Sequence, residues 1–263
     1  MSPVIVFGPT GSVGSVVAAT AGGLGAKVDA GFQRLQADLA DAASVKAAVR
    51  TTGATRAFVY LNWDSSDHMR ATFTALKACG IEFVVFLSSF TIQGDRHRIP
   101  ASAGIPFHHA QAELSLEEVF GVGNYAALRA GAFATNSFRY KYALQAGRVS
   151  VSGMTLDWIT AEDIGRVGAS VLVHGPKNGQ QIIYLYGPKR IHERDAVEII
   201  ANTIGRPVQI KDGAGMSRLA TFRGNAREPP RYREGVDNIS LYTGNPAMDF
   251  ETWARLHQEE FQH

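Results

Sequence analysis

Residues 4 to 14 of the chain are Val4-Ile-Val-Phe-Gly-Pro-Thr-Gly-Ser-Val-Gly14. The β-branched and aromatic run at the start predicts a short buried strand, and the small residues Ser12 to Ala21 predict a helix. Three glycines therefore stand in a turn between a strand and a helix. A glycine turn in that context is typical of a phosphate site, because the amides of the helix N-terminus face the ligand.

Each glycine of this turn has a separate task in such a site. Gly8 can take the tight turn, Gly11 lets the backbone approach a pyrophosphate, and Gly14 lets the helix pack against the sheet. We therefore expect the turn to bind a dinucleotide through Gly8, Thr10, Gly11, Ser12, Val13 and Gly14. The alternative is a glycine-rich turn that holds no ligand.

Strand and helix patterns alternate through most of the chain. Strands are expected at Arg56–Leu61, Phe83–Ser88, Tyr125–Arg129, Gln181–Tyr186 and Val208–Lys211. Helices are expected at Ser44–Arg50, Asp67–Cys79, Ala110–Phe120, Thr160–Val173 and Glu193–Ile204, and Arg223–Glu234 is expected to be an exposed loop. The alternation predicts an α/β fold, a doubly wound parallel Rossmann sheet with a smaller C-terminal α/β lobe. We expect the Rossmann domain to span residues 1–145 and the mainly substrate-binding lobe 146–263, with Gln181–Tyr186 a candidate to return to the sheet.

One part of this pattern conflicts with chain geometry. Strands are indicated at Ala26–Val28 and Phe32–Gln36, but only Asp29, Ala30 and Gly31 lie between them. A crossover between parallel strands needs about a dozen residues or more. Two explanations stay open: residues of a crossover are missing from this sequence, or a genuine deletion has removed the second strand. The same question applies, more weakly, to Arg223–Glu234.

Composition limits the classes of function. The 263 residues include 45% hydrophobic ones, which suffices for a substantial core, and the net charge is +2 without a basic run, so a nucleic-acid partner is not indicated. No apolar stretch approaches the ~18 residues of a membrane span, and the first predicted strand leaves no room for a signal peptide. The single cysteine, Cys79, is expected to be a small buried hydrophobe. We expect a cytoplasmic protein that takes a small-molecule substrate and binds no metal.

Further cofactor contacts are expected at the ends of other strands. Asp38 could accept a hydrogen bond from the adenine amino group, or could be a helix N-cap or turn residue. Leu61 and Asn62 end a strand beside the expected cofactor path, or are ordinary strand-end residues. The remaining candidates for cofactor contact are Leu39, Ser88, Phe90 and Phe133.

The chain resembles the NmrA-like family, an atypical branch of the short-chain dehydrogenase/reductase superfamily. The resemblance lies in residues 4–14 together with Gln36–Leu39, Phe86–Phe90, Leu128–Asn136, Glu162–Gly165 and Tyr184–Pro188. It implies a Rossmann domain that prefers NADP(H) and a C-terminal lobe that closes over a substrate cleft. It also implies that the segment after Val28 would carry a basic residue for the 2′-phosphate.

The catalytic pattern departs from that superfamily. Its typical reductases use a Tyr, a Lys four residues later and an upstream Ser; the Ser is present as Ser88 or Ser89. The Tyr-x-x-x-Lys window falls on Phe107–Gln111, where Phe replaces the acid and Gln replaces the lysine. Tyr125 and Arg129 have the spacing but lie on a predicted strand, and Tyr140 and Lys141 are adjacent. Delivery of a proton to an alkoxide is therefore in doubt.

Two functions fit this departure. The first is hydride transfer to a conjugated or aromatic electrophile of the quinone-methide or enone type, whose anion is already stable; His108 and His109 are the nearby groups suited to proton delivery, although either could be structural. The second is a non-catalytic redox sensor that reports NADP(H) to a protein partner. A homologue without cofactor is disfavoured by the intact turn. An enzyme needs an apolar pocket beside the nicotinamide, for which the candidates are Phe90, Gln111, Phe133, Asn136 and Trp158. The three aromatic residues among them could be core instead.

Overall fold

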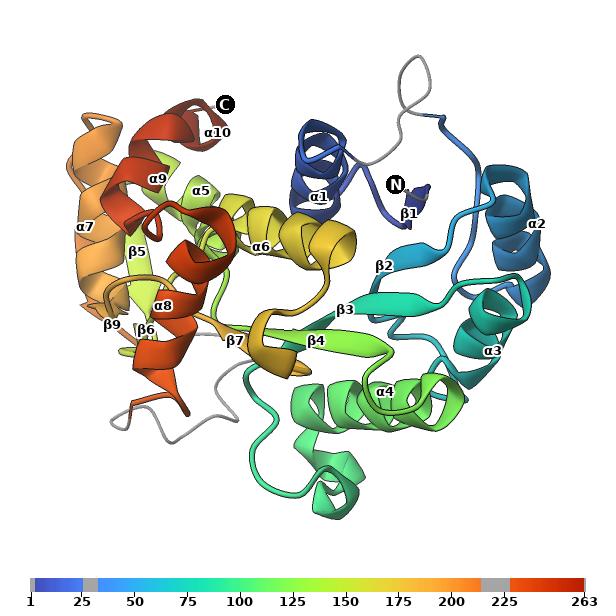
Figure 1. The fold of residues 1–263 in the computed structure, drawn as a ribbon. Coiled ribbons are helices and arrows are strands. Elements are labelled where there is room, and N and C mark those ends of the chain that lie inside the picture. The colour runs from blue at the N-terminus through green and yellow to red at the C-terminus, as the bar shows by residue number, and fades with distance from the viewer. Residues whose placement is uncertain (1–2, 26–32, 214–227, 263) are drawn as a thin grey trace.

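The computed structural model describes residues 3–25, 33–213 and 228–262. Its centre is a parallel five-stranded sheet in the order β1-β2-β3-β4-β7 (Figure 1). The strands are β1 (Val4–Val6), β2 (Arg56–Tyr60), β3 (Phe83–Ser89), β4 (Tyr125–Ala130) and β7 (Ile182–Leu185). All four strand pairs are parallel, and the central strands β3 and β4 are almost entirely buried. These continuous apolar strands are what a sheet covered on both faces requires.

Helices cover both faces of the sheet and form two hydrophobic cores with it. One core contains side chains of α1 (Ser12–Gly23), α6 (Ala161–His174) and α8 (Tyr232–Thr243). The other contains side chains of α2 (Ala42–Thr52), α3 (Arg70–Ala78) and α4 (Ile105–Phe120). The molecule therefore has the layered Rossmann-type arrangement that the alternating sequence pattern predicted.

A smaller lobe follows β4 and has its own core around Trp158 and Trp253. It contains a parallel pair, β5 (Arg148–Val151) with β9 (Gln209–Asp212), and an antiparallel pair, β6 (Thr155–Leu156) with β8 (Ile191–His192). Its helices are α5 (Lys141–Gln145), α7 (Glu193–Thr203), α9 (Phe250–Leu256) and α10 (Gln258–Gln262). Short 3-10 turns lie at Arg96–Arg98, Ala101–Ala103, Ala134–Tyr140 and Lys177–Gly179. The domain division at residue 145 stays a prediction, but β7 pairs with β4 and α6 packs on α1.

The N-terminal half of the sheet differs from the expectation. Residues 33–36 form no strand and are exposed, so the strand expected at Phe32–Gln36 is wrong for its described part. Ala26–Val28 and the segment to Phe32 lie outside the described residues. In the sheet as described, β1 is an edge strand. A doubly wound sheet carries two more strands beyond its first, and the segment 26–41 is too short for two strands and their crossover helix.

Several helix boundaries also differ, for local reasons. Helix α2 begins at Ala42, two residues before the expected start at Ser44, because the Asp41 carboxylate caps it; the Ser44 hydroxyl instead accepts from the Asp38 amide. Thr160 caps α6 by accepting from the Asp163 amide at 3.1 Å. Residues from Tyr232 onward form α8, so the exposed loop expected up to Glu234 is wrong there, and residues 223–227 lie outside the described part.

Candidate functional site

The glycine turn lies between β1 and α1, with its tip open to solvent. Gly8 has φ +66° and its carbonyl accepts from the Gly11 amide at 3.0 Å, which closes the turn. Gly11 is the N-cap of α1, has no side-chain cap, and is followed by a first turn without acidic residues. Thr10, Gly11 and Ser12 are exposed. The unpaired amides at this helix end are therefore free to meet an anion.

The three glycines differ in what surrounds them. A Cβ on Gly14 would lie 2.2 Å from the Gly8 carbonyl oxygen, so only glycine allows the helix to approach the turn. A Cβ on Gly11 would have one neighbour within 4 Å, the same oxygen at 3.4 Å. Gly14 is thus needed for packing, whereas Gly11 faces open space. That is the cradle that a pyrophosphate requires.

Tyr60, which was not among the predicted site residues, lies against one side of this turn. Its ring edge would lie 2.6 Å from a Cβ on Gly8, and the residue is 41% exposed. It is the last residue of β2, two residues after the buried Phe58 and therefore on the same face of the sheet. The period of two along β2 could have indicated this position.

The side chains of the other predicted cofactor residues form local hydrogen bonds or pack in the core. Asp38 is exposed, and its carboxylate accepts a hydrogen bond from the Ala40 amide at 2.8 Å. This is the contact of a turn residue, one of the two alternatives to a contact with adenine. Leu39 and Leu61 are buried in the core beneath α2 and α3. The Asn62 side chain accepts from the Asp64 amide at 3.2 Å. These residues lie beside the carboxyl ends of β1 and β2, but their side chains are already engaged.

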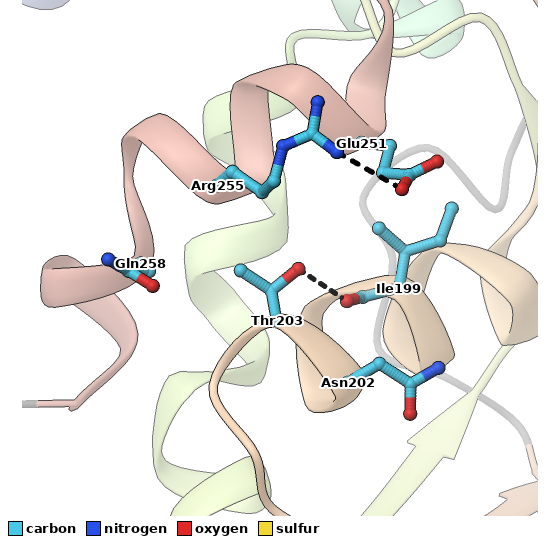
Figure 2. Close-up of a pocket in the computed structure, with 6 residues that line it drawn as sticks. All are labelled: Ile199, Asn202, Thr203, Glu251, Arg255 and Gln258. Carbon is cyan, nitrogen blue, oxygen red and sulfur yellow. Dashed lines mark hydrogen bonds and ion pairs between the residues drawn. The ribbon is translucent and has the colours of Figure 1, made fainter.

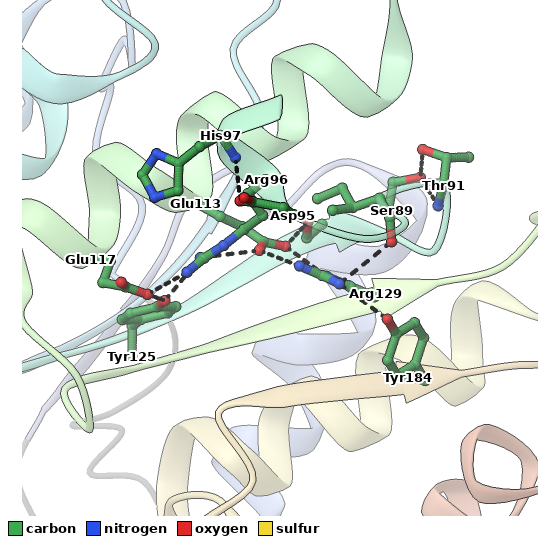
Figure 3. A network of polar contacts seen from close by, with 12 residues as sticks. Ser89, Thr91, Asp95, Arg96, His97, Glu113, Glu117, Tyr125, Arg129 and Tyr184 are labelled. Atoms are coloured by element: carbon green, nitrogen blue, oxygen red, sulfur yellow. Dashed lines mark hydrogen bonds and ion pairs between the residues drawn. The ribbon is translucent and has the colours of Figure 1, made fainter. Parts of the chain in front are cut away.

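Ser88 is held by a buried ion pair between α4 and β4. Its hydroxyl donates to one carboxylate oxygen of Glu113 at 2.6 Å. Arg129 donates to both oxygens of that carboxylate, from Nε at 3.0 Å and from Nη2 at 2.7 Å, and its third nitrogen donates to the Tyr184 hydroxyl at 3.0 Å (Figure 3). Glu113 is fully buried and Arg129 is 7% exposed. Ser88 is therefore committed to a structural network rather than free to donate to a ligand.

The network continues outward along α4. Arg96 lies between Glu113, at 3.5 Å, and Glu117, at 2.6 Å. The Tyr125 hydroxyl donates to Glu117 at 2.6 Å (Figure 3). Tyr125 and Arg129 thus have structural partners, which agrees with their expected place on a strand.

The two candidate histidines lie in the first turns of α4 in different surroundings. His109 is 8% exposed, its Nδ1 has no hydrogen-bond partner, and its ring lies 5.5 Å from that of Trp63 and 6.3 Å from that of Phe86. Burial, and secondarily the charges of His108 and Arg129, lowers the pKa of His109 to about 3. The ring is therefore neutral near pH 7, and the pH dependence between 6 and 7.5 expected of a donor does not apply to it. His108 is half-buried between Trp63 and Phe107.

One of the predicted substrate residues, Trp158, lies in the core of the smaller lobe. Trp158 is fully buried in the lobe core, where its Nε1 donates to the Ile191 carbonyl at 3.1 Å and its ring lies 5.0 Å from Phe250. Trp158 is therefore a core residue, which was the alternative to its predicted place in a substrate pocket. Phe90 and Phe133 are half-buried, Gln111 is half-buried on α4, and Asn136 is exposed.

A shallow cavity of about 600 Å³ lies elsewhere, between α7 and the C-terminal helices (Figure 2). Its lining is Ile199, Asn202, Thr203, Glu251, Arg255 and Gln258. None of these was a predicted site residue, and its Arg255–Glu251 ion pair is largely exposed. In the described parts of the chain, no three metal-ligating side chains cluster, and no helix is both long and apolar enough to cross a membrane.

The parallel sheet and the open glycine turn at the start of α1 define a protein of the Rossmann class. No protein-family model matches the chain. A curated relative, nitrogen metabolite regulation-like protein bik4 of Gibberella fujikuroi, is 37% identical over 317 residues, which cover 97% of this chain and 96% of the relative. The chain therefore belongs to the NmrA-like family.

Two solved structures show the same fold. The NADPH-dependent quinone oxidoreductase QOR2 of Escherichia coli, complexed with NADPH, has a TM-score of 0.72 at 17% identity, covering 95% of this chain and 98% of that one. The triphenylmethane reductase of Citrobacter sp. has a TM-score of 0.69 at 12% identity, covering 98% of this chain and 99% of that one. At these identities the likeness concerns the fold.

Replacing Arg129 by Met should destabilise the protein by about 3–5 kcal/mol, because it leaves the Glu113 carboxylate buried without its cation. Urea denaturation measures the change. The matched control is Arg255→Met, which breaks an exposed ion pair and should cost less than about 1 kcal/mol. Equal effects of the two substitutions would contradict the assigned importance of the buried pair.

Replacing His109 by Phe should make the protein less sensitive to acid. The folded state holds this ring with a pKa of about 3, whereas an unfolded chain binds the proton near pH 6.5. The unfolded state therefore takes up more protons as the pH falls below about 6.5, and wild type should lose up to roughly 1.4 kcal/mol per pH unit relative to the variant. Unfolding free energies at pH 4.5, 5.5 and 7.5 measure this; parallel pH curves for the two proteins would show that His109 titrates normally.

Proposed function

We propose that the protein binds NADP(H) at the Gly8–Gly14 turn and transfers hydride to a small conjugated or aromatic electrophile. The observation that carries this proposal is the composition of α4. Phe107 and Gln111 occupy the window of the usual acid and its lysine, and the neighbouring His109 is buried and neutral. Such a site favours acceptors whose reduced anion is delocalised and needs no proton in the transition state.

The residues of the turn fit the pyrophosphate of a dinucleotide. The amides of residues 12 and 13 would hold its phosphates, and the open space at Gly11 would admit them. When bound, NADPH supplies a hydride, and the resulting anion of the acceptor takes its proton from water. The preference for NADP(H) over NAD(H) follows from the family resemblance alone.

The fold neighbours support the acceptor class. One is named as a quinone oxidoreductase and the other as a reductase of triphenylmethane dyes, and the first was solved with NADPH. The acceptors that these two names give, quinones and triphenylmethane dyes, are both conjugated ring systems. His108 is the remaining candidate donor, and acceptors of this class do not require it.

Replacing Gly11 by Val should abolish dinucleotide binding in a folded protein. The residue has φ −80° and ψ 163°, which valine adopts readily, but the β-branched side chain would fill the space of the phosphates. Titration with NADPH should show an affinity at least about a hundredfold weaker, and NADH should bind wild type less tightly than NADPH. The control is Gly23→Val, where nothing lies within 4 Å of the new Cβ. Unchanged NADPH affinity in a folded Gly11→Val protein would refute the site.

Simple ketones and aldehydes should be poor substrates compared with quinones. Their alkoxides need a proton in the transition state, and general acid catalysis is typically worth ~10²–10⁴-fold. NADPH oxidation should therefore differ by at least about a hundredfold between menadione and cyclohexanone. With menadione, His108→Phe should change kcat less than tenfold, because no donor is needed. Efficient reduction of the ketone would show that the catalytic window has been misplaced.

A redox sensor that acts through a protein partner is the second candidate. The absence of the usual Tyr and Lys favours a sensor as much as it favours the reductase. The name of the relative, nitrogen metabolite regulation-like protein, also refers to regulation. Tight NADPH binding with no oxidation by any of a panel of electrophiles would decide for the sensor.

A further inference from the structure

Four aromatic side chains form a continuous series of edge-to-face contacts, which we call the aromatic corner: Trp63, His68, Phe107 and His108. Ring centroids are 5.5 Å apart for His68 and Phe107, 5.5 Å for Phe107 and His108, and 5.7 Å for His108 and Trp63. The planes in each pair meet at 66° to 89°. Rings at such angles pack edge to face rather than in a parallel stack.

The corner lies at the edge of the sheet where ligands of this fold bind. Trp63 and His68 belong to the segment that leaves the carboxyl end of β2. Phe107 and His108 lie in the first turns of α4, which follows the carboxyl end of β3 and leads to the parallel strand β4. In open α/β sheets this edge carries the ligand crevice. The corner is therefore on the same edge as the glycine turn.

The segment that carries Trp63 is held in place by its own hydrogen bonds. The Ser65 hydroxyl accepts from the Met69 amide at 2.7 Å and donates to Asp67 at 2.8 Å. The Asn62 amide is 3.3 Å from the buried Met69 sulfur. His68 and Met69 have φ of 53° and 66°, a costly conformation outside glycine. This strained segment keeps Trp63 52% exposed, although burial of so large a side chain would be favourable.

We propose that the aromatic corner binds the acceptor itself, a planar, uncharged conjugated dicarbonyl of the quinone class; this rests on the proposed function. The electron-rich indole of Trp63 stacks against an electron-poor ring, and Phe107 contributes apolar surface. The imidazoles of His68 and His108 each present a nitrogen that can donate to a carbonyl oxygen. The four side chains include no carboxylate, lysine or arginine, so nothing in the corner selects a charged ligand.

Tryptophan fluorescence tests this directly, without NADPH. Of the three tryptophans, Trp158 and Trp253 are fully buried, so quenching by an added quinone reports on Trp63. Menadione should quench wild type saturably, and cyclohexanone should not. Trp63→Leu should remove the saturable part, and His108→Ala, which keeps the reporter, should weaken menadione binding at least tenfold. The control Tyr142→Leu removes another aromatic side chain, 78% exposed on α5, and should change nothing.

Steady-state kinetics separates this proposal from the proposed function. His108→Ala should raise the KM for menadione at least tenfold and leave kcat and the NADPH Kd within a factor of three. Saturable, Trp63-dependent quenching without turnover would support the corner and refute the reductase. Turnover with unchanged KM in both Trp63→Leu and His108→Ala, or quenching that is purely linear in menadione, would overturn the corner.

Discussion

The close approach of α1 to the first turn and to α6 is the constraint on which the rest of the site depends. Gly14 brings the helix against the Gly8 carbonyl, and a Cβ on Gly165 of α6 would lie 2.5 Å from Val16 on the other side of α1. Because Gly14 and Gly165 have no side chain, α1 can pack closely against the turn on one side and against α6 on the other. This packing directs the free amides of α1 outward at the carboxyl edge of the sheet, where the other strands also end.

The buried titratable groups differ in whether they form an ion pair. Glu113 and Arg129 compensate each other and tie β3, α4 and β4 together through Ser88. Among the described residues, neither His109 nor Asp157 forms an ion pair. Burial lowers the pKa of His109 to about 3 and raises that of Asp157 to about 6, although backbone amides, first that of Ala132, and the charge of Arg190 oppose the rise. Between these pH values, acid destabilises the fold through His109 and stabilises it through Asp157. The two effects partly cancel, so the pH dependence of wild type alone would reveal neither.

Local signals in the sequence were enough for the strands β1, β2, β3, β4 and β7 and for the turn, because apolar strand runs and the three glycines each act within a few residues. Long-range pairing was not visible: Glu113 and Arg129 lie on different elements, and no spacing rule joins them. Trp158 was misplaced because a core aromatic and a pocket aromatic have the same pattern in a sequence. Helix α8 was missed because the Arg, Pro and Glu residues before it are typical of a loop. The aromatic corner needed the structure, since its two halves are far apart along the chain.

Two properties of a Rossmann domain depend on different sides of its sheet. The 317 aligned positions exceed the 263 residues of this chain, so more than fifty positions of the alignment have no counterpart here. In the described sheet β1 is the edge, whereas the residue that contacts the adenosine ribose normally lies about twenty residues beyond the turn, after the next strand. Phosphate binding in a Rossmann domain depends on the glycine turn, and this turn is complete here. Discrimination of the 2′-phosphate depends on the side of the sheet beyond the first strand. In a Rossmann domain, affinity for the dinucleotide and selectivity between its two forms therefore rest on different parts of the sheet.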